Sequence, residues 1–111
     1  MSIKYDEYDL LELFGSFPIM LCDDYDVGIY YYSYTDSCGL EVSLNFSVYE
    51  QKCGMGLSIN NICHFEIDLS NVVYLRKEDW RLRIRQQNVE VDYIICFKPN
   101  IFVTTEKVEG K

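Results

Sequence analysis

Three aspartates, Asp23, Asp24 and Asp26, gather within four residues of the chain. Closely spaced carboxylates can bind calcium or act as a general acid and base. A calcium loop of the EF-hand type needs oxygen ligands at alternate positions, then a glycine and a distal glutamate. Gly28 follows the aspartates, but no glutamate stands at the required distance. The pattern therefore matches a calcium loop only weakly.

The rest of the chain offers little else for catalysis. It has one histidine, His64, and we find no Ser/His/Asp arrangement, P-loop or G-x-G-x-x-G motif. The five cysteines are odd in number and have no C-x-x-C spacing, which predicts free thiols and no zinc site. We therefore expect no enzyme activity, no metal and no cofactor. A small hydrolase or metal-dependent enzyme that uses the Asp23–Asp26 cluster is the least favoured alternative.

Arginines alternate along residues 80–85, the sequence WRLRIR, at positions 81, 83 and 85. Such a row could bind phosphate or RNA. The following segment, VEVDYIICF, supplies Glu90 and Asp92 with the same alternation. If Gln87–Asn88 forms a two-residue turn, Arg85 lies opposite Glu90 and Arg83 opposite Asp92. We favour this reading, in which the arginines are neutralised across a hairpin.

The stretch CDDYDVGIYYYSYTD, residues 22–36, is both acidic and aromatic, with four carboxylates, five tyrosines and no base. As a strand over residues 24–34 it would point alternate side chains to opposite faces. We expect the core side to carry Tyr25, Val27, Ile29, Tyr31 and Ser33, and the outer side Asp24, Asp26, Tyr30, Tyr32 and Tyr34. The outer set is either a contact surface for a basic partner or an ordinary solvated strand face, and both readings remain open.

Hydrophobic patterns indicate the elements that position these residues. Residues 5–16 have apolar side chains at helical spacing (Tyr8, Leu11 and Phe14, with Leu10 alongside), and Gly15 ends the predicted helix. Residues 39–50 alternate as a half-buried strand, and CGMG at 53–56 predicts the break after it. Further strands are predicted over residues 62–70, 71–77 and 101–107. The fold class is mainly β (α+β): an antiparallel β-sandwich or strongly bent sheet of about seven strands with one short N-terminal helix.

Length and charge restrict the functions that this chain could have. The 111 residues predict a single domain over 1–111, and the sequence has no signal peptide or apolar run of membrane-spanning length, which predicts a cytoplasmic protein. The net charge is −8, and residues 1–50 hold ten acids and one base, whereas residues 51–111 hold eight acids and nine bases. This excess disfavours direct binding of nucleic acid and favours a basic protein partner.

The segment LFGSFP, Leu13 to Pro18, and the closing IICFKPNIFVTTE carry a family resemblance. A helix that ends in Leu-Phe-Gly-x-Trp-Pro, followed by an Asp-bearing link and antiparallel strands, resembles the β-rich immunity proteins of bacterial polymorphic toxin and contact-dependent growth inhibition systems. Phe17 stands in the position of the tryptophan, and Asp23 or Asp24 in that of the aspartate. The resemblance implies a cytosolic, non-catalytic inhibitor that binds the C-terminal domain of a cognate toxin, in many cases a nuclease with a basic cleft.

The leading hypothesis is thus an immunity protein that neutralises a toxin by acidic surface complementarity. The predicted contact residues are Asp23, Asp24, Asp26, Tyr30, Tyr32 and Tyr34, with Asp36 and Glu41 as a rim. The alternative is a phage-encoded acidic DNA mimic that inhibits a host nucleic-acid enzyme.

Overall fold

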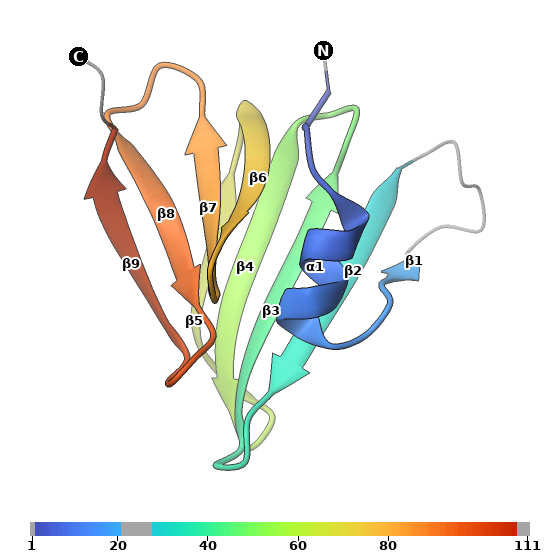
Figure 1. Cartoon of the computed structure of the whole chain (residues 1–111), viewed down its shortest axis with the longest axis vertical. Coiled ribbons are helices and arrows are strands. Elements are labelled where there is room, and N and C mark those ends of the chain that lie inside the picture. Colours follow the sequence, from blue (N-terminus) through green and yellow to red (C-terminus); the bar gives the residue numbers. More distant parts are fainter. Residues whose placement is uncertain (1, 21–27, 109–111) are drawn as a thin grey trace.

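A computed structural model describes residues 2–20 and 28–108, in which one helix and nine β-strands form (Figure 1). The helix α1 (Glu7–Phe14) begins after Asp6, whose side chain accepts hydrogen bonds from the backbone N–H groups of Tyr8 (2.8 Å) and Asp9 (3.4 Å). It ends at Gly15, which adopts a left-handed conformation with φ of 71° and donates its N–H to Leu11. The predicted helix is confirmed, and it has a capping residue at each end.

The buried stripe of α1 differs from the predicted one. Leu10, Leu13 and Phe14 are buried, whereas Tyr8 is 71% exposed. Residues 10, 13 and 14 lie on one side of a helix with 3.6 residues per turn, so the stripe is displaced from the expected one by part of a turn. The helix packs on β2 and β6 and so contacts strands of two different sheets.

The first sheet has the order β1-β2-β3-β4-β5, and every neighbouring pair is antiparallel. Its strands are β1 (Ile19–Met20), β2 (Ile29–Thr35), β3 (Leu40–Ser47), β4 (Lys52–Ile59) and β5 (Ile62–Leu69). Asn60 and Asn61 form the two-residue turn between β4 and β5, both with positive φ. Asparagine tolerates this conformation better than most residues, so the turn chemistry matches the hairpin.

The second sheet has the order β6-β7-β8-β9 and is also antiparallel throughout. Its strands are β6 (Val72–Glu78), β7 (Arg81–Gln86), β8 (Val91–Cys96) and β9 (Phe102–Lys107). In both sheets neighbours in space are neighbours in sequence, and Figure 1 shows β7, β8 and β9 to the left of β2, β3 and β4.

The core lies between the two sheets and under α1. It includes fully buried side chains from the first sheet (Val42, Leu44, Phe46) and from the second (Leu82, Ile84, Ile95). The expected inward face of β3 is therefore confirmed. The N-terminal segment joins the sheets, because Ile3 N–H donates to Val48 while Lys4 exchanges hydrogen bonds with Val73 and Leu75 of β6.

The predicted fold class, an antiparallel β-rich fold with one short helix, is confirmed, although the described residues contain nine strands rather than about seven. The expected break at CGMG is wrong. Gly54 and Gly56 lie inside β4, where Cys53 and Met55 alternate with them and point into the core. The two glycines continue the outer face of the strand in place of larger residues.

The β7–β8 hairpin also differs from its predicted register. Arg83 pairs with Ile94 and Ile84 with Tyr93, which moves the pairing by two residues and makes the loop longer than Gln87–Asn88. A shift of two preserves the faces of both strands, so the core assignment survives. The predicted ion pair of Arg83 with Asp92 also forms, although the two residues are no longer directly opposite each other. Arg85 bonds to Asp92 in place of Glu90.

Candidate functional site

The predicted contact residues lie in very different environments. Asp23, Asp24 and Asp26 fall within residues 21–27, outside the described part of the chain. Asp36 lies in the turn after β2, where its carboxylate accepts hydrogen bonds from the backbone N–H groups of Cys38 (2.9 Å) and Leu40 (3.0 Å). Glu41 is half-exposed at the start of β3. Asp36 thus stabilises the β2–β3 turn, whatever else it contacts.

The predicted orientation of the β2 tyrosines is wrong. Tyr30, Tyr32 and Tyr34 pair directly with Phe46, Leu44 and Val42. Directly opposed residues share one face of a sheet, so these tyrosines face the core. Tyr32 is 2% exposed, and Tyr30 and Tyr34 are half-buried against the core.

Aromatic contacts account for the inward position of these tyrosines. The Tyr32 ring lies 5.2 Å from Phe14 and stacks parallel to Phe46 at 6.2 Å, and the Tyr34 ring lies 6.1 Å from Phe97. Burial raises the pKa of Tyr32 to about 12. Three large rings bury more apolar area than Ile29, Tyr31 and Ser33 on the other side of the strand, so the energetically better face points inward.

The outer surface of the first sheet is polar. We call it the polar face; its members are Tyr31, Ser33, Glu41, Ser43, Asn45, Gly54, Gly56, Ser58, Glu66 and Asp68, which the pairing of β2 to β5 places on one side. Its three carboxylates, Glu41, Glu66 and Asp68, form no ion pair within residues 2–20 and 28–108. The polar face therefore presents three carboxylates without ion-pair partners in the described residues, and the paired residues Ser47 and Lys52 continue this side of the sheet at one end of β3 and β4.

Small residues shape the middle of the polar face. A Cβ atom on Gly54 would lie 2.9 Å from Asn45 Nδ2 and 3.0 Å from Asp68 Oδ1, and one on Gly56 would lie 3.1 Å from Ser43 Oγ. The glycines thus make room for neighbouring polar side chains. Beside them is a pocket of about 520 Å³, to which Asn45, Ser47, Gly54 and Asp68 contribute.

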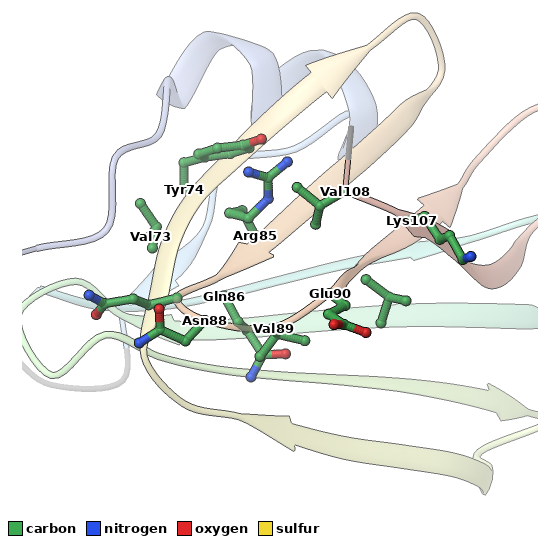
Figure 2. Close-up of a pocket in the computed structure, with 11 residues that line it drawn as sticks. Val73, Tyr74, Arg85, Gln86, Asn88, Val89, Glu90, Lys107 and Val108 are labelled. Atoms are coloured by element: carbon green, nitrogen blue, oxygen red, sulfur yellow. The ribbon is translucent and has the colours of Figure 1, made fainter. Parts of the chain in front are cut away.

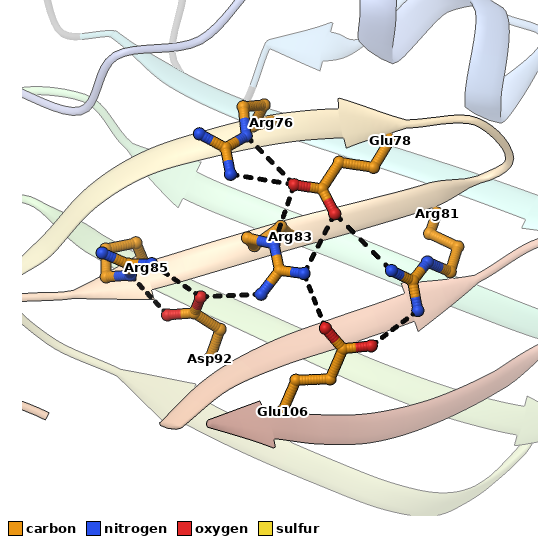
Figure 3. Close-up of polar contacts among 7 residues, drawn as sticks. All are labelled: Arg76, Glu78, Arg81, Arg83, Arg85, Asp92 and Glu106. Atoms are coloured by element: carbon orange, nitrogen blue, oxygen red, sulfur yellow. Dashed lines mark hydrogen bonds and ion pairs between the residues drawn. The ribbon is translucent and has the colours of Figure 1, made fainter. Parts of the chain in front are cut away.

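The outer surface of the second sheet carries the predicted arginines in an ion-pair network (Figure 3). We call it the arginine network; it comprises Arg76, Glu78, Arg81, Arg83, Arg85, Asp92 and Glu106. Arg83 is its centre and donates to Glu78 (2.9 and 3.0 Å), Asp92 (2.8 Å) and Glu106 (2.6 Å). The expected pairing of the arginines with carboxylates is confirmed for Asp92, whereas Glu78 of β6 and Glu106 of β9 take the place of Glu90. Three carboxylates face four guanidinium groups.

Asp92 is the buried member of this network, with a fully buried side chain. Burial alone would raise the pKa of Asp92, but hydrogen bonds from Arg85 and Arg83 hold the pKa below its usual value. Hydrogen bonds from Arg83 likewise lower the pKa values of Glu78 and Glu106. All three acids therefore remain charged at neutral pH, and the network is a structural element of the second sheet.

A larger pocket of about 860 Å³ opens at the end of β7, beside the β7–β8 loop (Figure 2). Tyr74, Arg85, Asn88, Glu90 and Lys107 are among its lining residues. The Arg85 guanidinium lies 5.2 Å from the Tyr74 ring centre and also bonds to Asp92. Its charge is thus already compensated, and the pocket lacks an unpaired arginine for an anion.

Metal-binding side chains and reactive thiols are two further kinds of site to look for in residues 2–20 and 28–108. No group of three or more His, Cys, Asp or Glu side chains there is arranged to hold a metal ion. Cys38, Cys53, Cys63 and Cys96 are free thiols, and burial raises the pKa of Cys53 to about 12. Across residues 2–20 and 28–108, the single helix is too short and too polar to cross a membrane.

Sequence reasoning identified the polar positions of β3 and β5 but missed their convergence around Gly54. The available signal was the alternation of Gly54, Gly56 and Ser58 with apolar residues, which is the period of a strand. That pattern was obscured because glycines also mark turns.

Comparison with known proteins bears on the fold. No family model and no curated protein sequence matches the chain. The chain is similar to one chain of a solved structure, a contact-dependent growth inhibition toxin–immunity protein complex from Klebsiella pneumoniae 342. The TM-score is 0.79 at 22% identity, and the match covers 97% of this chain and 100% of that chain. The resemblance to β-rich immunity proteins of such systems is therefore confirmed at the level of the fold.

Proposed function

We propose that the protein is an immunity protein, which binds a cognate toxin domain and neutralises it without catalysing a reaction. The observation that carries this proposal is the shared fold with a chain of a toxin–immunity complex over nearly the whole length of both chains. The charge supports the same function, because a chain of net charge −8 suits a basic partner. We expect the protein to act in the cytoplasm, where a delivered toxin would meet its substrate.

We further propose that the toxin domain is a nuclease with a basic substrate cleft. An acidic inhibitor complements such a cleft electrostatically, and complementary charge accelerates association. The proposed contacts are Asp23, Asp24 and Asp26, with Asp36 and Glu41 at the rim. The buried Tyr32 is excluded, and Tyr30 and Tyr34 are no longer part of the proposed surface because they face the core.

Growth protection and binding test the function directly. The C-terminal domain encoded by the reading frame immediately upstream would be expressed with and without this protein in a sensitive host. We expect toxicity from the domain alone, full protection on co-expression, and a stable complex of the two purified proteins. An upstream domain that is toxic but neither bound nor neutralised would refute the proposal.

Association kinetics test the acidic contacts. We expect the double substitution Asp24→Lys with Asp26→Lys to slow association with the toxin domain at least tenfold at low salt, with a smaller effect at high salt because ions screen the charges. The control, Glu12→Lys with Glu90→Lys, changes the net charge equally at exposed positions elsewhere. Equal association rates for the two double variants would remove Asp24 and Asp26 from the contact surface.

A further inference from the structure

The pocket on the polar face combines features that fit a specific group of the partner. It lies near the end of β3, the start of β4 and the end of β5, and its volume of about 520 Å³ admits one side chain. Its charged lining residues are Glu50, Lys52 and Asp68, which leaves one net negative charge. Neither carboxylate forms an ion pair within the described residues.

Two hydrogen-bond acceptors converge above Gly54. The Asp68 carboxylate oxygen Oδ1 lies 3.0 Å and the Asn45 amide oxygen 3.1 Å from the point that a Cβ on Gly54 would occupy. The Asn45 amide nitrogen lies 2.9 Å from the same point, so this side chain presents a donor there as well as an acceptor. They come from the strands on either side of β4, and only a glycine between them leaves this space open. The sheet register itself therefore brings the two acceptors together.

A third polar group in the same pocket lacks a partner. Ser47 is 8% exposed, lines the pocket, and its hydroxyl forms no hydrogen bond within the described part of the chain. A buried hydroxyl without a partner destabilises the folded protein. Its hydrogen-bonding capacity is available to a group that enters the pocket.

We propose, on the basis of the function proposed above, that this pocket receives an arginine side chain of the toxin domain. The guanidinium group would donate to Asp68, to the Asn45 amide oxygen and, after a small side-chain adjustment, to the Ser47 hydroxyl. Arginine fits better than lysine because its planar group holds five N–H donors in fixed directions and can reach several acceptors at once. Lys52, at the same pocket, opposes the incoming charge and weakens the contact.

Titration of the isolated protein tests the pocket without the toxin. We would add N-acetyl-L-arginine amide to the full-length, isotopically labelled protein and follow its backbone amide signals by NMR. We expect saturable shifts at Asn45, Ser47, Gly54 and Asp68, weakened about tenfold by Asp68→Asn. The control Glu66→Gln removes a neighbouring charge of the polar face and should leave the titration nearly unchanged. Non-saturable shifts, or equal effects of the two variants, would overturn the proposal.

The complex with the toxin domain provides the second test. We expect Asp68→Asn to weaken the complex about tenfold, Lys52→Gln to strengthen it, and Ser47→Ala to weaken it without destabilising the free protein. If the toxin domain binds wild type and these variants equally, the pocket proposal fails while the immunity function stands. If the toxin domain does not bind at all, the immunity function fails, and the arginine titration still decides whether the pocket accepts a guanidinium group.

Discussion

Arg83 connects three carboxylates from three different strands, Glu78 of β6, Asp92 of β8 and Glu106 of β9. The central strand β7 thus supplies one side chain that joins the whole second sheet. The buried Asp92 depends on it, because a carboxylate removed from water is stable only when it is paired and hydrogen-bonded. Alternation in the sequence predicted that the arginines of β7 share a face with Asp92, whereas the contribution of Glu78 and Glu106 follows only from the pairing of the four strands.

We therefore expect Arg83→Ala to lower the free energy of unfolding by about 3 kcal/mol, since Asp92 would stay buried with Arg85 as its remaining partner. Arg76 provides the matched control, because its side chain is 55% exposed and bonds only to Glu78 in the network. Arg76→Ala should lower the free energy of unfolding by less than about 1 kcal/mol. Urea denaturation of both variants measures the difference. Similar losses would show that burial of Asp92 does not set the energetics of the network.

At the scale of elements, strand alternation predicts that two faces exist but does not say which one is inside. For β3 the choice was clear, because one face was apolar and the other polar. For β2 both faces carried aromatic residues, and the pairing with Val42, Leu44 and Phe46 decided the question. The pocket on the polar face could not be predicted from alternation either. Asn45 and Asp68 are brought together only by the pairing of their strands with the intervening β4.

Substitutions of two adjacent tyrosines on β2 test which side of this strand faces the core. Tyr32→Ala should lower the free energy of unfolding by about 3–5 kcal/mol, because it removes a buried ring that packs against Phe14 and Phe46. Tyr31→Ala removes the same atoms from the half-exposed outer side of the strand and should lower the free energy of unfolding by about 1 kcal/mol. Thermal and urea denaturation compare the two. A larger loss of stability for Tyr31→Ala than for Tyr32→Ala would show that Tyr31, and not Tyr32, faces the core.

At the scale of the whole molecule, each sheet is assembled from strands that are consecutive in sequence. Local signals therefore went far toward predicting a β-rich fold with an N-terminal helix. The association of the two sheets depends on contacts distant in sequence, among them the hydrogen bonds that join Ile3 to Val48 and Lys4 to Val73 and Leu75. No local pattern marks such contacts, so the sequence left open a sandwich or one bent sheet.

The attachment of the N-terminal segment to both sheets has a consequence for the order of folding. Each sheet can form from contacts close in sequence, which is the faster kind of contact to make. The surface on which residues 3–14 pack exists only once both sheets are in place, because α1 contacts β2 and β6. Ile3 bonds to Val48 after β3, and Lys4 bonds to β6. We expect this segment to dock after the rate-limiting step.

Leu10, which is 1% exposed on α1, reports on that step. Leu10→Ala should accelerate unfolding and leave the refolding rate almost unchanged, whereas Leu44→Ala in β3 should slow refolding. Stopped-flow measurements in urea distinguish these outcomes, and slower refolding of Leu10→Ala would contradict late docking. During synthesis residues 3–14 would emerge from the ribosome before β6 and would accordingly wait for it before they reach their native contacts.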